Sequence, residues 1–108
     1  MAQAKPQTTA GRDPVSVDPD HYRVETENDQ VRVLRARYGP KEKSVMHTHP
    51  ASVAIFMTDA RCRFTYPDGK KEDHDIKAGT TMTMPAMDHL PENLGNTPIE
   101  VILVELKR

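Results

Sequence analysis

The sequence predicts an all-β protein, a sandwich or barrel of about eight or nine short strands, and three observations support this fold class. Short runs of β-branched and aromatic residues alternate with turn-forming residues from Tyr22 onward. No segment repeats its apolar residues at the helical period of about 3.6. Three histidines, His47, His49 and His89, fall at strand-like runs, where they can share one interior face.

The expected strands follow one another along the chain with turns between them. They are residues 22–26, 31–38, 45–49, 52–57, 61–66, 71–76, 80–84 and 99–106. The tetrad Pro67-Asp68-Gly69-Lys70 predicts a tight hairpin, because proline fixes φ and glycine tolerates positive φ. The last run is almost continuously apolar, as expected of a strand covered on both faces.

The 108 residues suffice for one domain with one modest core. Residues 1–20 are polar and contain Pro6, Pro14 and Pro19, with no periodic apolar pattern to bury. We therefore expect a flexible or extended N-terminal arm that contributes little to the barrel. Residues 21–108 are then expected to form the single β-barrel domain.

Charge and composition narrow the classes of partner. The sequence has 15 basic and 16 acidic residues, a formal charge of -1, so no basic surface field favours nucleic acid or an acidic membrane. It has neither an apolar run of about 18 residues nor a secretion signal, so we expect a cytoplasmic protein without a membrane segment. The single cysteine, Cys62, excludes an intramolecular disulfide, in agreement with a reducing compartment.

The spacing of the histidines indicates a metal site. His47 and His49 are two residues apart, and in a strand such residues lie on the same face about 7 Å from each other. That is close enough for both to bind one ion. His89 follows His49 by forty residues, just after another strand-like run. The set predicts a three-imidazole site inside the barrel; a hydrogen-bonded interior pair without metal is the alternative interpretation.

These residues resemble the two motifs of the cupin superfamily, specifically of the small single-domain cupins. One cupin motif has a glycine, then His-x-His and an acidic residue, and the other has glycine, proline, histidine and asparagine. The matching residues are Gly39, His47, His49, Gly79, Pro85, His89 and Asn93. The resemblance spans roughly residues 31–106 and implies a jelly-roll barrel with an internal metal centre.

The sequence departs from the cupin pattern at the acidic ligand, where it has Ser52-Val53-Ala54. The resemblance therefore implies three imidazole ligands and no carboxylate. Three neutral ligands leave a divalent ion its full charge and open positions, which favours a substrate that binds as an anion. Imidazoles bind Fe, Mn, Ni, Co, Cu or Zn, so the identity of the divalent transition metal stays open. We expect no other cofactor.

A small apolar pocket is expected over the metal. Its candidate wall residues are Met57, Met82 and Met84 together with Phe56, Phe64, Tyr66 and Tyr38, and ordinary core packing is the alternative role of the methionines. Glu92 and Glu105 are candidates for a hydrogen-bond acceptor behind a ligand or for a proton shuttle, with a surface or strand-edge position as the alternative. Cys62 is expected to be a packed interior thiol, while His74 and His21 are expected to lie outside the site.

The resemblance implies metal-dependent chemistry on a small organic acid or a similar molecule. A dioxygenase is the first option, and an isomerase or lyase is the next. A non-catalytic module that binds or senses a metabolite is the alternative, because the superfamily hosts both kinds of protein. We also expect a homodimer, since small barrels with apolar outer sheets commonly cover those sheets by pairing.

Overall fold

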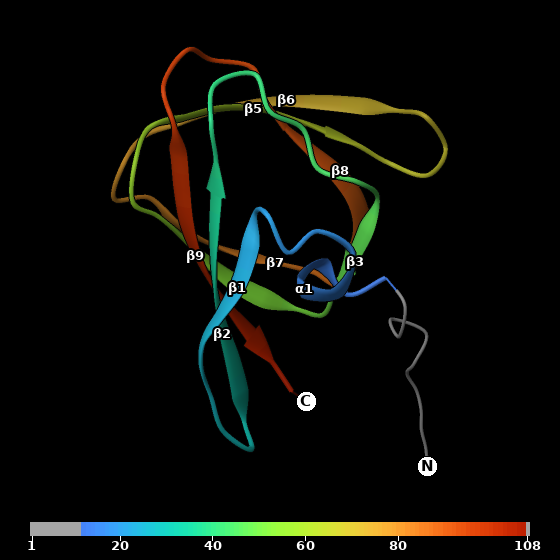
Figure 1. Ribbon diagram of the computed structural model, residues 1–108, viewed down its shortest axis with the longest axis vertical. Coiled ribbons are helices and arrows are strands. Elements are labelled where there is room, and N and C mark those ends of the chain that lie inside the picture. The colour runs from blue at the N-terminus through green and yellow to red at the C-terminus, as the bar shows by residue number, and fades with distance from the viewer. Residues whose placement is uncertain (1–11, 108) are drawn as a thin grey trace.

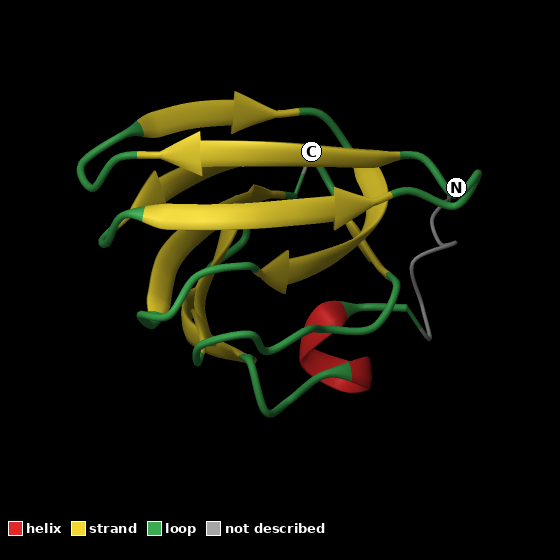
Figure 2. Ribbon diagram, turned by 90° about the horizontal axis from the view of Figure 1, so that it is seen from above, coloured by secondary structure: helices red, strands yellow, loops and turns green. Residues whose placement is uncertain are grey.

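The computed structural model describes residues 12–107, and they form two antiparallel β-sheets that pack face to face (Figure 1, Figure 2). The strands are β1 Tyr22–Glu27, β2 Val31–Tyr38, β3 His47–His49, β4 Ser52–Phe56, β5 Ala60–Thr65, β6 Lys71–Ile76, β7 Thr81–Met84, β8 Met87–Asn93 and β9 Ile99–Leu106. One sheet has the order β1-β2-β9-β4-β7, and the other has the order β3-β8-β5-β6. The expected all-β class is confirmed.

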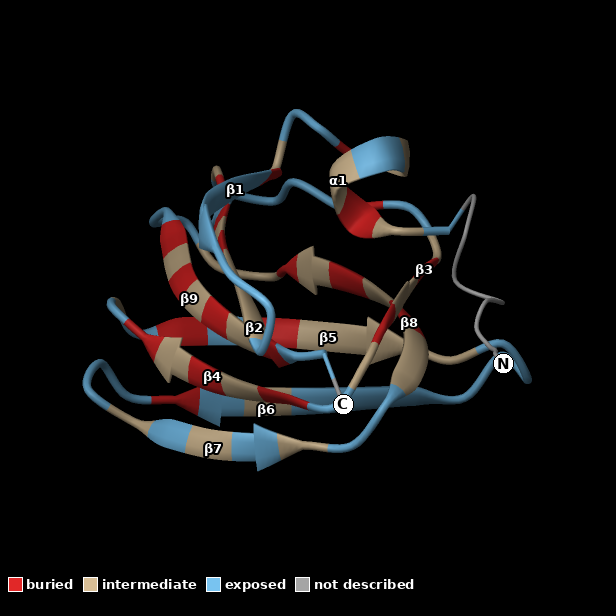
Figure 3. Ribbon diagram, turned by 90° about the horizontal axis from the view of Figure 1, so that it is seen from below, coloured by how far each residue is buried: buried red, intermediate tan, exposed pale blue. Residues whose placement is uncertain are grey.

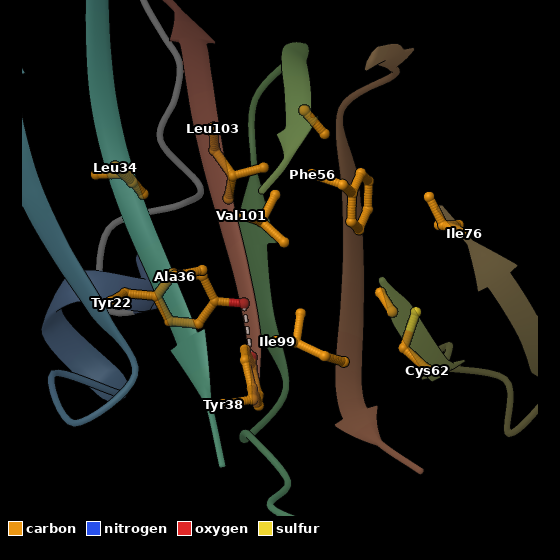
Figure 4. Packing of buried hydrophobic residues seen from close by; sticks show 12 residues of the cluster. Tyr22, Leu34, Ala36, Tyr38, Phe56, Cys62, Ile76, Ile99, Val101 and Leu103 are labelled. Atoms are coloured by element: carbon orange, nitrogen blue, oxygen red, sulfur yellow. Dashed lines mark hydrogen bonds between the residues drawn. The ribbon is translucent and has the colours of Figure 1, made fainter. Parts of the chain in front are cut away.

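One face of each central strand points into the barrel. Buried and less buried residues alternate along β4 and β9, which is visible as stripes in Figure 3. The inward residues of β2, β4, β5 and β9 form a single apolar cluster, to which Leu34, Phe56, Cys62 and Leu103 belong (Figure 4). The apolar β9 lies between β2 and β4, as its composition predicts. This packing fixes the register of the central strands β2, β4 and β9, because a slip of one residue would turn their apolar side chains outward.

Strand β8 was not expected, since a proline within a run argues against a central strand. Pro91 nevertheless lies opposite Phe64 of β5, and its carbonyl oxygen accepts a hydrogen bond from the Ser44 backbone N–H at 2.9 Å. β8 pairs with β3 over residues 87–89 and with β5 over residues 90–93. Pro91 therefore lies in the part of β8 that pairs with β5 and no longer with β3.

The N-terminal stretch before β1 is folded onto the barrel. Helix α1 (Pro14–Val17) makes a single turn, and the side chain of Asp13 caps it by accepting from the Val15 N–H. Proline at the first helical position favours this start, because its φ already suits a helix. Pro14 and Asp18, at the two ends of the turn, are both buried.

This stretch also pairs with the strand that carries two of the histidines. The Thr48 backbone N–H donates to the Arg12 carbonyl oxygen at 2.9 Å, and α1 lies beside β3 (Figure 1). The expectation of a flexible or extended arm is thus corrected for residues 12–20. Pro14 and Asp18 are buried there, but no periodic apolar pattern in the sequence indicated it. Residues 1–11 lie outside the described residues. The described part of the chain contains no helix of the length and apolarity needed to cross a membrane.

Candidate metal centre

The three histidines meet on one interior face because β3 and β8 are neighbours. His47 lies directly opposite His89 in the ladder, and His49 is two residues further along β3. All three side chains are buried, and the nitrogens that they can offer to an ion lie within 4.8 Å of one another. The rings are nearly perpendicular in pairs, with centroids 4.7 to 5.1 Å apart. The predicted set of residues is therefore brought together.

Hydrogen bonds on the outer side fix which ring nitrogen faces the centre. His47 Nδ1 lies 2.9 Å from the carbonyl oxygen of Val45, and His49 Nδ1 lies 2.9 Å from Glu105 Oε2. Both partners accept hydrogen, so each neutral ring carries its proton on Nδ1 and a lone pair on Nε2. The two Nε2 atoms are 3.1 Å apart. Two lone pairs at this distance repel each other, and a cation that both nitrogens bind removes the repulsion.

A proton shared by the two Nε2 atoms would instead give the hydrogen-bonded pair considered above. It would not explain why His89 is buried beside them without a hydrogen-bond partner among the described residues. Neither ring nitrogen of His89 has a hydrogen-bond partner among the described residues, although the side chain is buried. Burial lowers the pKa of His89 to about 2, with the charges of His49 and His47 adding to the effect. Burial likewise lowers the pKa of His47 to about 3. Both imidazoles therefore stay neutral, which is the form that binds metals.

Glu105 supports His49 from behind. It is buried on β9, opposite Ser52 of β4 and Arg32 of β2, so it lies in the middle of the sheet and the strand-edge alternative is wrong. Arg32 Nε donates to Glu105 Oε1 at 3.0 Å, and the same guanidinium donates to both carboxylate oxygens of Asp13. Burial alone would raise the pKa of Asp13, but the hydrogen bond and charge of Arg32 lower it.

These contacts join His49 to a row of alternating charges, Glu105, Arg32 and then Asp13 at the start of α1. Ser52, at the position where the cupin pattern has its acid, faces inward with a neutral hydroxyl. The carboxylate of Glu105 binds the Nδ1 side of His49, and among residues 12–107 no carboxylate joins the group of three imidazole nitrogens. The negative charge thus lies behind a candidate ligand rather than among the ligands.

A cavity of about 70 Å³ opens beside His49 and His89, with mostly apolar walls. Of the expected wall residues, Tyr38, Phe56, Phe64 and Met84 line it. The other three do not, which corrects the prediction. Met57 is 52% exposed, because it follows β4 at a turn and Phe56 takes the inward position. The other two lie outside the cavity for different reasons, described next.

Tyr66 and Met82 occupy the margins of the barrel. Tyr66 comes after the last residue of β5, where its hydroxyl donates to Glu72 at 2.8 Å. Met82 lies on the edge strand β7 and packs against the apolar cluster without reaching the cavity. Glu92 lines the cavity, but it is only partly buried, and its backbone forms a bridge with Lys43. It therefore has no position comparable to that of Glu105.

Two tyrosines, Tyr22 and Tyr38, belong to the site, and of these Tyr22 was not among its predicted residues. The ring of Tyr22 packs edge-on against His47 at 5.0 Å and lies 5.8 Å from His49. Its hydroxyl is 2.7 Å from the hydroxyl of Tyr38, and both residues line the cavity (Figure 4). The shared parity of Tyr38 and the inward Ala36 was the available sequence signal. Burial raises the pKa of Cys62 to about 11, so this cavity-lining thiol stays protonated, as expected.

Comparison with solved structures identifies the fold. The chain is similar to a cupin domain from Bordetella pertussis, with a TM-score of 0.75 and 24% identity over 81% of this chain and 92% of that one. It is also similar to an RmlC-like cupin family protein with a double-stranded β-helix fold from Methanocaldococcus jannaschii, with a TM-score of 0.61 and 19% identity over 82% and 83% of the two chains. The fold is that of a small cupin domain, as the sequence motifs implied.

A third similar structure is described as a sugar phosphate isomerase from a cupin superfamily, from Silicibacter pomeroyi. Its TM-score is 0.59 and its identity 14%, over 89% of this chain and 66% of that chain. No protein-family model matches the sequence, and no curated protein matches it. The structural likenesses therefore establish the fold, and the chemistry has to be argued from the site.

Proposed function

We propose that the protein is a metal-dependent enzyme in which His47, His49 and His89 hold one divalent transition metal ion. The observation that carries this proposal is the pair of Nε2 atoms 3.1 Å apart, on rings whose Nδ1 atoms face hydrogen-bond acceptors, beside a third buried imidazole that has no hydrogen-bond partner among residues 12–107. Buried polar atoms without partners cost free energy, and an ion between them supplies the missing interaction. When bound, the ion would serve as a Lewis acid that polarises a substrate and stabilises its anionic form.

The cavity favours a small and largely apolar substrate with one acidic group, such as a carboxylic acid, a thiol or an enol. Its free volume of about 70 Å³ limits the size, and its described lining contains neither lysine nor arginine. A phosphate group would find no cationic side chain there, in contrast to what a phosphorylated sugar requires. The positive charge for the substrate would therefore come from the ion itself.

The chain's own residues would orient the substrate and keep water out. Glu105 holds the His49 ring in one tautomer, and the Val45 carbonyl does the same for His47. Phe64 packs against His89 with ring centroids 4.5 Å apart and covers that side of the site. Dioxygenase chemistry fits three neutral ligands with open positions, and isomerase or lyase chemistry is the second option. Which of these applies depends on the ion.

Elemental analysis of the purified protein tests the metal site. We expect about one divalent transition metal ion per chain in the wild type and a stoichiometry near zero in His49→Ala, because two ligands hold such an ion poorly. His74→Ala is the matched control, since His74 lies on β6 and hydrogen-bonds to Glu72. Unchanged metal content in His49→Ala would overturn the proposal.

Oxygen uptake by the iron-loaded or manganese-loaded protein, with small acids, thiols and diketones as substrates, tests catalysis. Turnover that His89→Ala abolishes would support an oxygenase. Thermal stabilisation by one of these molecules without any turnover would instead identify a metabolite-binding module. The homodimer and the cytoplasmic location stay predictions, and light scattering of the purified protein checks the first.

A further inference from the structure

The inner face that carries the three histidines also carries a methionine. β3 and β8 pair so that His47 lies opposite His89 and His49 lies opposite Met87. Residues directly opposite each other in a ladder point to the same side of the sheet, with Cβ atoms about 4.5–5.5 Å apart. Met87 thus takes the fourth corner of a rectangle whose other corners are the candidate ligands. It lines the cavity together with His49 and His89.

A second methionine lies beside the position where the cupin pattern has its acid. Met84 of β7 is directly opposite Ser52 of β4, and both residues line the cavity. Ser52 offers a short and neutral hydroxyl, so the longer side chain at this side of the cavity is that of Met84. The acid of the cupin pattern is therefore replaced here by a hydroxyl with a thioether next to it.

A methionine side chain is suited to meet an ion from either position. Its sulfur sits on an unbranched chain with three rotatable bonds, so it can turn toward the ion without a change in the backbone. Met84 and Met87 are only partly buried, which leaves room for such a turn. The thioether sulfur carries lone pairs and no hydrogen, so it binds a cation without losing a proton.

The third sulfur at the cavity wall, the thiol of Cys62, lies further along the barrel. Cys62 is opposite Asn93 of β8, and residues 89 and 93 of a strand are about 13 Å apart. Met87 lies on the same strand as His89 at half that separation, about 7 Å. Among the described sulfurs that line the cavity, the two thioethers are therefore the ones near the imidazoles.

Sulfur ligands change which ion such a site prefers. Imidazoles bind most divalent ions of the first transition row, and Cu(II) binds the most tightly of them. Thioethers are soft ligands that favour Cu(I), whereas carboxylates suit harder ions such as Mn(II). Two thioethers in place of a carboxylate thus shift the preference toward copper, and toward its reduced form in particular.

We propose that Met84 and Met87 make the three-histidine site selective for copper, because they supply a thioether sulfur that stabilises bound Cu(I). This inference rests on the metal site proposed above and names the ion that the site takes. It concerns binding alone: the ion enters already as Cu(I), so no electron moves and no proton leaves the protein.

Anaerobic competition titrations of the full-length protein test this selectivity. Cu(I) is titrated against the chelator bicinchoninate, and Co(II) is followed in parallel by its visible absorption. In the double variant Met84→Leu/Met87→Leu we expect the Cu(I) affinity to fall by about tenfold or more, while the Co(II) affinity stays within about threefold. Leucine keeps nearly the same apolar volume and removes the sulfur.

X-ray absorption at the copper K-edge reports the ligand atoms directly. The Cu(I)-loaded wild type should show a sulfur neighbour beside nitrogen, and the double variant should show nitrogen without sulfur. Cys62→Ala should keep the sulfur neighbour. If the methionines only packed against the cavity, neither the loss of sulfur nor the selective loss of Cu(I) affinity would occur.

Met57→Leu is the matched control, since Met57 is 52% exposed and does not line the cavity. Equal Cu(I) affinity in the wild type and the double variant would overturn the inference, and so would a sulfur neighbour that only Cys62→Ala removes. If the double variant does not fold, Met84→Leu and Met87→Leu are measured separately, and unchanged Cu(I) affinity in both would count against the inference.

The two ions also separate this inference from the proposed metal site. A wild type that binds neither Cu(I) nor Co(II) would refute the site and the role of the thioethers with it. Co(II) binding that His49→Ala abolishes, combined with unchanged Cu(I) affinity in the double variant, would refute the role of the thioethers alone.

Discussion

At the scale of single residues, the proposed metal centre depends as much on Glu105 as on the histidines. Its carboxylate joins His49 to Arg32, both of which are largely buried, so it cannot be removed without leaving a donor on each side. A carboxylate behind an imidazole ligand fixes the ring and raises its basicity. The cupin pattern has an acidic ligand where this chain has Ser52. Here Glu105 supplies a negative charge instead, from behind His49.

Glu105→Gln should therefore weaken metal binding by about 10- to 100-fold, because the amide keeps the shape but loses the charge-assisted hydrogen bond. A competition titration with a chelator measures the affinity. Glu100→Gln is the matched control, since Glu100 lies on the same strand and pairs with Arg35 outside the site. Equal losses in both variants would contradict the role assigned to Glu105.

The sequence predicted the three histidines because their spacing on β3 is local, and because the cupin motifs connect them to His89. It gave Glu105 only as a candidate. Glu105 lies 56 residues from His49, and their contact depends on the order of strands in the sheet, which no local pattern encodes. Met57 was misplaced although alternation along β4 already points it outward, since it follows the inward Phe56.

At the scale of elements, the register of β4 decides which position can add a ligand. Ser52 is buried and lines the cavity, whereas Val53 has the opposite parity in the same strand. Ser52→Glu should tighten metal retention during dialysis by adding a charged oxygen. It should also destabilise the metal-free protein, because the new carboxylate lies across from Glu105.

Val53→Glu provides the comparison and should leave metal retention unchanged. Retention that rises in Val53→Glu but not in Ser52→Glu would show that β4 faces the centre with its other side. Elemental analysis after dialysis, together with thermal unfolding of the chelator-treated protein, distinguishes these outcomes.

The elements that sequence patterns missed are those that tertiary contacts stabilise. α1 has a single turn, too short to show an amphipathic period, and it persists because Asp13 binds Arg32 and Pro14 is buried. β8 contains Pro91, which the pairing with two different strands accommodates. The eight expected strands, in contrast, carry local alternation or turn residues that suffice to predict them.

At the scale of the whole molecule, the N-terminal stretch closes the side of the barrel next to the centre. A chain that begins at Pro19 lacks Asp13 and Asp18, so Arg32 loses a partly buried partner and Ser44 loses a buried one. We expect its melting temperature to fall well below that of a chain that begins at Arg12, by about 4–8 °C for each kcal/mol lost. Equal melting temperatures would restore the view of this stretch as a dispensable arm.

The stability of the molecule should also depend on pH through His21. Burial alone would lower the pKa of His21, but hydrogen bonds with Asp18 and Glu42 raise it above its ordinary value. The folded state then holds this proton more tightly than the unfolded state. The resulting stability is fully present below about pH 6.5 and is lost as the pH rises through the raised pKa.

Urea unfolding of the wild type and of His21→Gln measures this contribution. The difference in their free energies of unfolding should shrink as the pH rises from about 6 to about 9. NMR titration of the His21 ring gives the pKa directly, and a value at or below that of a free imidazole would contradict the prediction.

The direct pairing of His47 with His89 would make a bound ion a removable cross-link. Within residues 12–107, β3 is a three-residue strand at the edge of its sheet; β8 is its ladder partner, and one further backbone hydrogen bond comes from Arg12. An ion bound by both strands joins chain positions about forty residues apart, as a disulfide would, and a chelator takes the place of a reductant. At a free metal concentration 100 times its dissociation constant the ion adds about 2.7 kcal/mol to the folded state. The free metal concentration would then determine how stable the pairing between β3 and β8 is.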